Sequence, residues 1–546
     1  MSEEDRDARP VTDVAAAAGL APGEVLPWGR GIAKIDADAL LTRTAGRPRG
    51  RLVCVTAVTP TRFGEGKTTT AIGLTDGLGA IGRRPVLCLR EPSVGPVFGR
   101  KGGGAGGGRA QLVPMERVNL HFTGDIHAVA AATNLLASML DASLIHDNRL
   151  RIDPGTVTWR RAIDVNDRVL RRIELGLDPG EGAFPRPSGF DIAAASEVMA
   201  ILSVAADLRD LRRRLGAITV AHDDAGRPVT AEDLRAAGAM TVLLRDALDP
   251  NLVQTREGRP AIVHAGPFAN IAHGNNSVIA DRVALALGDY AVTESGFGAD
   301  LGFEKFCDIV CPGAGLTPDA VVVVASVGTL RHHGGGGDGP RALADGAANL
   351  RRHLGIVRAF GLPCVVAVNR RAGDEAIDLE RVCELALEAG AGAAVVCEAF
   401  DRGGAGATAL AEAVVAACEE PADFRPLYAS ELPLAEKLEA IATRVYGAAG
   451  ITLAPAAAAG LSRLESEGLG GLPVCVAKTP LSFTADPAIV GAPTGFTLPV
   501  RDVRAYTGAG WVVALCGDVM LMPGLPDGPV AETIDIDAAG RTVGLF

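Results

Sequence analysis

The sequence has few aromatic residues and no excess of positive charge. Phe, Trp and Tyr together make up 4% of its 546 residues, whereas glycine alone occurs 68 times. The formal charge of −12 argues against the basic surface that nucleic-acid binding requires. We therefore expect a protein with no nucleic-acid partner, whose helices pack closely on a sheet and whose anionic substrates bind in local positive pockets.

Targeting and membrane-spanning segments are also missing from the sequence. The first residues, MSEEDRDARPVTD, are acidic and polar, unlike a signal peptide. The apolar run AVVVVASVG around Val322 has the length of a buried strand. Cys307 and Cys311 are the only close pair among ten cysteines, and no further zinc ligands stand near them. We expect a cytoplasmic protein with reduced cysteines, no membrane partner and no structural metal.

Apolar runs alternate with helical segments along much of the chain. RLVCVTAVT, PVLCLR, DAVVVVASV and LPCVVAVN are apolar at successive positions, and each is followed by a helical or glycine-rich segment. Runs of this kind indicate parallel strands that are covered by helices on both faces. The sequence predicts an α/β fold with a doubly wound, mostly parallel sheet.

The stretch VTAVTPTRFGEGKTTTAIGLTDGL contains a strand, a glycine loop and a helix in that order. In a phosphate-binding loop (P-loop) the N–H groups at the helix start face the phosphates, Lys67 reaches the terminal phosphates and Thr68 holds Mg²⁺. The strict pattern has glycine where this chain has Thr61. An ordinary glycine turn would leave GKTTT unexplained, so the sequence predicts a nucleoside triphosphate site. Its expected residues are Thr61, Arg62, Phe63, Gly64, Glu65, Gly66, Lys67 and Thr68.

A chain of this length fits roughly two to four domains. The region 127–270 differs from its surroundings because arginine and leucine recur there at helical spacing. We predict a nucleotide-binding P-loop domain over 1–126 plus 271–362, an inserted domain over 127–270 and a C-terminal α/β domain over 363–546.

Two further segments suggest anion binding. Arg90 and Glu91 follow the strand PVLCL, at the sheet edge where ligands of open parallel sheets bind. The guanidinium of Arg90 suits a transferred phosphoryl group, although a plain surface salt bridge is the alternative. The stretch RKGGGAGGGRAQ at 100–111 has cations at both ends, which a flexible linker seldom has. A tether is the alternative, but we expect this stretch to be an anion cradle beside the phosphate-binding loop.

Long motifs follow one another in a distinctive order. The chain contains TPTRFGEGKTTT, LREPSVGPVFGRKGGGAGGGRAQLVPM, VNLHFTGDIHAVAAATNLL, NLVQTREGRPAIVHAGPFANIAHGNNSVIAD, TESGFGADLGFEKF and GDVMLMPGLPDGPVAETIDID. This order resembles that of the formate–tetrahydrofolate ligases, and the resemblance extends over nearly the whole chain.

The resemblance implies a two-step ligation. Formate attacks the γ-phosphate of MgATP to give formyl phosphate and ADP, and the N10 amine of tetrahydrofolate then displaces phosphate. It also implies a cytosolic homotetramer that a monovalent cation (K⁺ or NH₄⁺) stimulates. Lys67, Arg90 and Glu91 become the catalytic candidates. The formate and formyl phosphate pocket would then comprise Arg90, Lys101, Gly102, Gly103, Phe297 and Gly298.

The chain departs from the family pattern mainly around the acceptor. Arg371 and Phe400 stand where the family has the Phe and Trp that are thought to sandwich folate, and Arg109 replaces a tyrosine. Gly328 replaces an arginine, and Phe303 a small residue. We place Arg371, Phe400 and Arg109 in the acceptor pocket, with tetrahydrofolate as the leading acceptor. A different amine acceptor and a non-catalytic nucleotide-binding relative are the alternatives.

Histidines provide a last set of candidates. His121 and His127 flank Asp125, but their spacing is not a recognised metal-ligand spacing. We expect them to have structural or substrate-contacting roles. His273 stands in a polar loop, NIAHGNNS, and we expect it to line the site.

Overall fold

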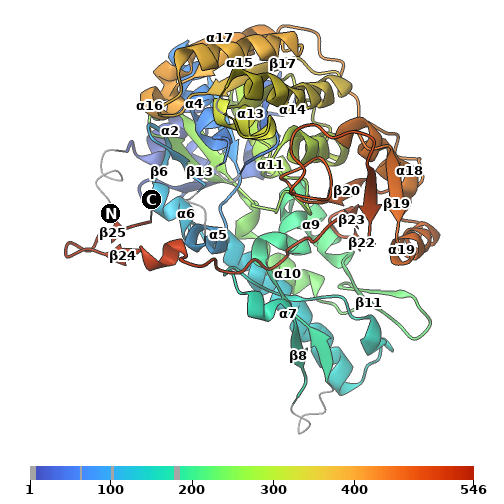
Figure 1. Ribbon diagram of the computed structural model, residues 1–546. Coiled ribbons are helices and arrows are strands. Elements are labelled where there is room, and N and C mark those ends of the chain that lie inside the picture. Colours follow the sequence, from blue (N-terminus) through green and yellow to red (C-terminus); the bar gives the residue numbers. More distant parts are fainter. Residues whose placement is uncertain (1–7, 62–63, 100–103, 178–184, 338, 546) are drawn as a thin grey trace.

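The computed structural model describes residues 8–61, 64–99, 104–177, 185–337 and 339–545. Its centre is a 12-stranded sheet with the order β1-β2-β13-β14-β4-β15-β3-β16-β17-β18, which β6 and β5 join through β13 (Figure 1). These strands are β1 Val25–Pro27, β2 Ala33–Ile35, β3 Arg51–Ala57, β4 Pro85–Leu89, β5 Gly106–Gly107, β6 Ala110–Val113, β13 Asn251–Thr255, β14 Pro260–Val263, β15 Tyr290–Glu294, β16 Ala320–Ala325, β17 Cys364–Asn369 and β18 Ala393–Cys397.

All neighbours from β14 to β18 pair in parallel, whereas the pairs at the β1 end are antiparallel. The prediction of an α/β fold with a mostly parallel sheet is therefore confirmed. The sheet also includes β13 and β14 from the region 127–270, and β17 and β18 from the region 363–546. Sheet membership thus cuts across the proposed domain boundaries, which stay a prediction.

Both faces of the sheet are buried because its strands are apolar at successive positions. Along β3, Leu52 and Cys54 belong to one buried cluster and Val53 and Val55 to another. Helices α4 (Lys67–Ala80), α11 (Val278–Leu287), α14 (Pro340–Ala359), α15 (Ala376–Glu388) and α17 (Thr408–Ala417) cover the sheet. Successive side chains of a strand point to opposite faces, so each cluster is the core on one side.

The middle of the chain forms the lower part of the molecule in Figure 1. It contains α7 (Asp125–His146), α8 (Glu197–Val204), α9 (Leu208–Gly216) and α10 (Ala237–Leu244), together with two-stranded sheets. Among the helices that the structure describes, α7 alone is long and apolar enough to pass for a membrane span. Its Val129, Leu136 and Leu140 are fully buried in the core cluster that it shares with the sheet.

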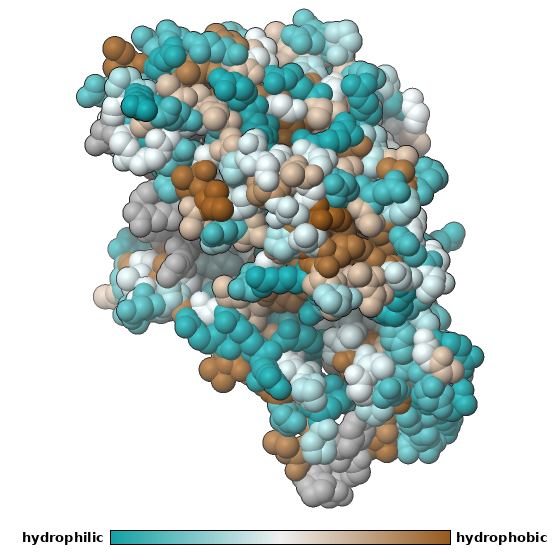
Figure 2. Space-filling model, turned by 45° about the vertical axis from the view of Figure 1, so that its right-hand side comes forward, coloured by the Kyte–Doolittle hydropathy of each residue, from teal (hydrophilic) through white to brown (hydrophobic). Residues whose placement is uncertain are grey.

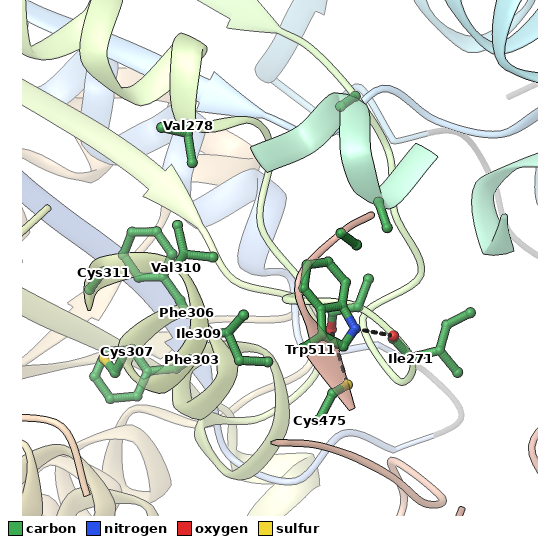
Figure 3. Close-up of a cluster of buried hydrophobic side chains, with 14 of the residues drawn as sticks. Ile271, Val278, Phe303, Phe306, Cys307, Ile309, Val310, Cys311, Cys475 and Trp511 are labelled. Carbon is green, nitrogen blue, oxygen red and sulfur yellow. Dashed lines mark hydrogen bonds between the residues drawn. The ribbon is translucent and has the colours of Figure 1, made fainter. Parts of the chain in front are cut away.

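The C-terminal region packs against the core through a small three-stranded sheet of β20 (Val474–Ala477), β23 (Trp511–Leu515) and β22 (Asp502–Tyr506). Figure 3 shows Trp511 among apolar side chains, with its indole N–H donating to the Ile271 carbonyl at 3.4 Å. Phe303 lies fully buried in a π-helical segment, Ala299–Phe303. Its ring packs edge-on against Phe360 at 5.5 Å, so Phe303 is a core residue.

The last part of the chain leaves this region and crosses the molecule toward α5 (Val94–Phe98) and α6 (Met115–Asn119) (Figure 1). The Val530 N–H donates to the Gly99 carbonyl at 2.9 Å, and the Thr542 hydroxyl donates to the Glu116 carboxylate. On the face in Figure 2, hydrophilic side chains predominate and hydrophobic ones form separate patches.

Candidate functional site

The loop between β3 and α4 adopts the predicted strand–loop–helix arrangement. Gly66 immediately precedes α4 and has a φ of 76°, in the left-handed region that favours glycine. An ideal Cβ on Gly66 would lie 2.2 Å from Asn369 Nδ2. No side chain caps the start of α4 among the described residues, so its first N–H groups are left for a ligand. Arg62 and Phe63 lie outside the described residues.

Lys67 and Thr68 face two charged residues from neighbouring strands. The Thr68 hydroxyl donates to Glu294 Oε2 at 2.6 Å, and Arg90 Nη2 lies 3.9 Å from Glu294 Oε1. Arg90 follows β4 and Glu294 ends β15, and the sheet order β4-β15-β3 puts both beside the loop that follows β3. Glu294 is the residue of this group to which the sequence analysis gave no catalytic or binding role. Its position at the carboxyl end of a strand was the available signal.

Two partly buried positive charges, Lys67 and Arg90, come together in this group. Burial lowers the pKa of Lys67, although Glu294 and Glu65 oppose that shift. Burial also lowers the pKa of Arg90, and Glu294 again opposes it. A phosphate arriving here would replace lost solvation with direct charge pairing. The oxygens of Thr68 and Glu294 are the hard ligands that Mg²⁺ prefers, so these residues fit a magnesium ion carried by a nucleotide.

Glu91, the third catalytic candidate, has different charged neighbours from Lys67. Its carboxylate is buried, and its pKa lies well above the usual range because of burial and the nearby Asp125, with Lys34 opposing. Lys34 and Asp125 form a buried ion pair at 2.9 Å. The Glu91 backbone N–H donates to the Ala265 carbonyl at 2.7 Å. Glu91 therefore belongs to a buried acidic group behind Arg90.

Glu65 is the centre of a polar network within the loop. Its carboxylate is buried and accepts from the Thr61 N–H at 2.8 Å, the Thr61 hydroxyl at 3.0 Å and the Thr329 hydroxyl. The Arg371 guanidinium lies 3.7 Å from Glu65 Oε2 and donates to the Gly64 carbonyl. Arg371, which we assigned to the acceptor pocket, thus also holds two residues of the phosphate loop.

Hydrogen bonds hold Thr59, which lies where the chain leaves β3 and enters the loop. Its hydroxyl lies 2.9 Å from His353 Nε2 and accepts from Asn349 Nδ2 at 3.0 Å. The His333 Nε2 donates to the Thr59 carbonyl at 2.9 Å, and its Nδ1 accepts from the Gly491 N–H at 3.2 Å. The Asn349 amide also donates to the Gly491 carbonyl at 2.7 Å. A segment near the end of the chain therefore helps to hold the loop in place.

The described part of the glycine stretch, 104–111, is tightly packed. An ideal Cβ on Gly106 would lie 2.2 Å from the Ala110 carbonyl, and one on Gly108 would lie 2.2 Å from the Phe400 carbonyl. The Arg109 N–H donates to that Phe400 carbonyl at 2.8 Å. This packing excludes a tether for the described part. It also puts Arg109 beside Phe400, whose ring is half exposed. Lys101, Gly102 and Gly103 lie outside the described residues.

The segment after β15 approaches Arg90. An ideal Cβ on Gly296 would lie 2.9 Å from Arg90 Nη2, so only glycine lets the guanidinium lie there. Phe297 has a φ of 61°, which is uncommon for a residue with a side chain. Gly298 packs against Asp300, which forms a fully buried ion pair with Lys478 at 2.9 Å. Phe297 and Gly298 are therefore held one and two residues from the Arg90 contact.

The histidine candidates do not form a metal site. His121 Nδ1 lies 2.7 Å from His127 Nε2 in a stacked pair. No group of His, Cys, Asp and Glu that could hold a metal ion occurs in the described part of the chain. His273 is buried and lies 2.8 Å from the Ser203 hydroxyl. Burial, with Arg90 and Lys305 nearby, lowers its pKa to about 3, so it is neutral near Arg90.

Comparison with known proteins shows the family to which the chain belongs. The family model described as formate–tetrahydrofolate ligase matches residues 2–546. A formate–tetrahydrofolate ligase of Paracoccus denitrificans (strain Pd 1222) is 55% identical over 98% of both chains, and one of Roseiflexus sp. (strain RS-1) is 54% identical over 98% of both. One of Desulforamulus reducens is 52% identical, over 98% of this chain and 97% of the relative. The chain belongs to the formate–tetrahydrofolate ligase family.

Proposed function

We propose that this enzyme joins formate to tetrahydrofolate at the expense of ATP, through formyl phosphate, and releases 10-formyltetrahydrofolate, ADP and phosphate. Family membership supports the reaction. The observation that carries the site is the group of Lys67, Thr68, Arg90 and Glu294 at the carboxyl edge of the sheet.

The nucleotide occupies the loop between β3 and α4. The uncapped N–H groups of α4 receive phosphate oxygens, Lys67 contacts the terminal phosphates, and Thr68 and Glu294 hold Mg²⁺. Thr61, Arg62, Phe63, Gly64 and Glu65 complete the loop.

Arg90 stabilises the phosphoryl group during transfer. A formate oxygen attacks the γ-phosphorus, the bond to the ADP oxygen breaks, and the negative charge on the transferred group is shared with Lys67 and Arg90. Phe297 and Gly298 form the formate side of the pocket. Glu91 supports Arg90 from behind through its bond to Ala265.

The acceptor enters beside Phe400. The N10 amine attacks the formyl carbon, the carbon–oxygen bond to phosphate breaks, and the amine proton is lost to solvent or phosphate. The half-exposed Phe400 ring offers a stacking face, with Arg109 next to it and Arg371 on the loop side. A homotetramer in the cytoplasm and stimulation by K⁺ or NH₄⁺ are part of this proposal.

The other two readings are not favoured. A different amine acceptor would rest on Arg371 and Phe400, but the chain retains more than half its residues in common with ligases named for tetrahydrofolate. A non-catalytic relative would rest on Gly328, yet Lys67, Thr68, Arg90 and Glu294 are assembled.

Purified enzyme tests all three readings. ADP release should require formate and Mg²⁺, rise with tetrahydrofolate and match 10-formyltetrahydrofolate one to one. Hydroxylamine should trap formyl hydroxamate when tetrahydrofolate is withheld. ADP release with formate and another amine, but never with tetrahydrofolate, would overturn the acceptor. ATP binding without formyl hydroxamate or ADP would overturn the catalytic assignment.

A further inference from the structure

Six arginines surround a cavity at the opposite end of the sheet from the phosphate loop. The cavity has a volume of about 610 Å³ and lies where β3, β4 and β15 begin. Its arginines are Arg43, Arg47, Arg49, Arg51, Arg83 and Arg84. Arg51 begins β3 and Ala57 ends it. At about 3.3 Å per residue, the cavity is about 20 Å from the residues where the phosphate loop starts.

Carboxylates neutralise only part of this charge. Asp289 is the only acid among the lining residues, and it pairs with Arg84 at 2.6 Å. Two further acids reach the arginines from outside the cavity: Glu24 pairs with Arg43 and Asp319 with both Arg49 and Arg51. Six arginines thus face three carboxylates, in a chain whose overall charge is −12.

Two of the arginines are available for a ligand. Arg47 and Arg83 are exposed and form no ion pair with a residue that the structure describes. The acids whose pKa they lower, Glu24 and Asp289, are already bonded to Arg43 and Arg84.

Two other arginines are already held in position. Asp319 is buried and accepts from Arg49 at 2.8 Å, from Arg51 at 2.9 Å and from the Leu52 N–H at 2.7 Å. A ligand would therefore meet guanidinium groups whose ordering cost has largely been met on folding.

We propose that this cavity binds a small polyanion that carries at least two phosphate or carboxylate groups. Guanidinium groups on several sides suit such a ligand because each can donate two parallel hydrogen bonds to one anionic group. The volume lies within the range of small-molecule sites in proteins. The site is independent of the proposed reaction, since none of its residues belongs to the phosphate loop.

Calorimetric titration with inorganic triphosphate tests the proposal, with the sodium salt at constant ionic strength. The wild-type enzyme should bind two triphosphates per chain, one in the phosphate loop and one in the cavity. In the double variant Arg47→Glu/Arg83→Glu the cavity site should weaken at least about tenfold, because two charge-assisted contacts are lost. Lys67→Ala should weaken the other site alone.

Two controls separate the cavity from general charge effects. The Arg47→Glu/Arg83→Glu enzyme should keep its kcat, and Arg341→Glu, a change at a highly exposed arginine of α14, should leave both binding sites unaltered. If the acidic double variant fails to fold, Arg47→Ala/Arg83→Ala replaces it. A single binding site in the wild type, or a second site that persists in the double variant, would overturn the proposal. Loss of a dimer in sedimentation together with unchanged triphosphate binding would assign the surface to a second copy instead, and would overturn it too.

Discussion

Arg371 offers the sharpest test of how the proposed acceptor pocket is connected to the phosphate loop. Its guanidinium donates to the Gly64 carbonyl and lies 3.7 Å from the buried Glu65 carboxylate. Position 371 should therefore control the binding of ATP as well as that of the acceptor. We expect Arg371→Ala to raise the KM for ATP and to leave the formate dependence nearly unchanged.

The size of the effect follows from these contacts. A hydrogen bond from a charged group contributes about 1.5–3 kcal/mol when it is buried. The Arg371 side chain is 33% exposed, so we discount this to about 1–2 kcal/mol. That range corresponds to a rise in the KM for ATP of roughly 5-fold to 30-fold. Arg371→Lys keeps a charge near Glu65 without the planar fork, and we expect an intermediate value.

Steady-state ADP release, measured separately against ATP and tetrahydrofolate, gives the required comparison. Arg370→Ala is the matched control, because this neighbouring arginine pairs with Glu398, the residue that precedes α16 (Ala399–Arg402). The structure records no contact between its side chain and the described residues of the loop. A KM for ATP within twofold of wild type in Arg371→Ala would refute our reasoning. Arg371 would then act only on the acceptor.

Three further outcomes are expected. Thr68→Ala removes a ligand of the proposed magnesium site, so the Mg²⁺ concentration for half-maximal ADP release should rise about tenfold. The control Thr69→Ala should leave that concentration unchanged. Equal Mg²⁺ requirements in both variants would contradict the assignment of Thr68. Gly108→Ala would put a Cβ 2.2 Å from the Phe400 carbonyl and so displace Phe400. The KM for tetrahydrofolate should therefore rise more than the KM for ATP. Unaltered KM values would show that Phe400 does not contact the acceptor. Burial lowers the pKa of His353 to about 3 against 6.5 when unfolded, so the unfolded chain binds the proton first and stability falls as pH drops from 6.5 toward 3. At pH 5 the resulting loss in the free energy of unfolding is about 2 kcal/mol. Denaturant titrations at pH 7 and pH 5 should show that His353→Gln loses less free energy of unfolding between these pH values than the wild type or the exposed control His332→Gln. Equal losses in all three proteins would contradict this role of His353.

The central sheet was predictable because burial on both faces leaves a direct trace in sequence. Val321–Val324 are apolar at every position and lie at 0% exposure in β16. The antiparallel end was not predictable, since β13 begins with Asn251 and carries Gln254 and Thr255. Their polar groups are satisfied by distant partners, such as Asp125 for Asn251 and Asp76 for Thr255. Pairing across more than a hundred residues leaves no local pattern.

In the candidate site, too, features set by neighbouring residues were predictable and features set by distant segments were not. Local geometry was readable, because a glycine at the start of α4 and the following Lys67 and Thr68 are adjacent in sequence. The role of Glu294 was not readable, since it depends on β15 lying between β4 and β3. The further contacts of Glu91 and Arg371 were not readable for a similar reason. Which neighbours a side chain meets, Asp125 for Glu91 and Gly64 for Arg371, is decided by packing between segments far apart in the chain.

The link between Thr59 and Gly491, which runs through Asn349 and His333, bears on how the enzyme is made. Thr59 leaves the ribosome early, whereas the Gly491 backbone that bonds Asn349 and His333 is synthesised more than four hundred residues later. At roughly 5–20 residues per second the delay is tens of seconds. Throughout that time the nascent nucleotide loop lacks part of its support. A growing chain therefore completes the support of this loop only after residue 491 has been made. Fragments that end before residue 491 should bind nucleotide poorly even though they contain the whole glycine loop.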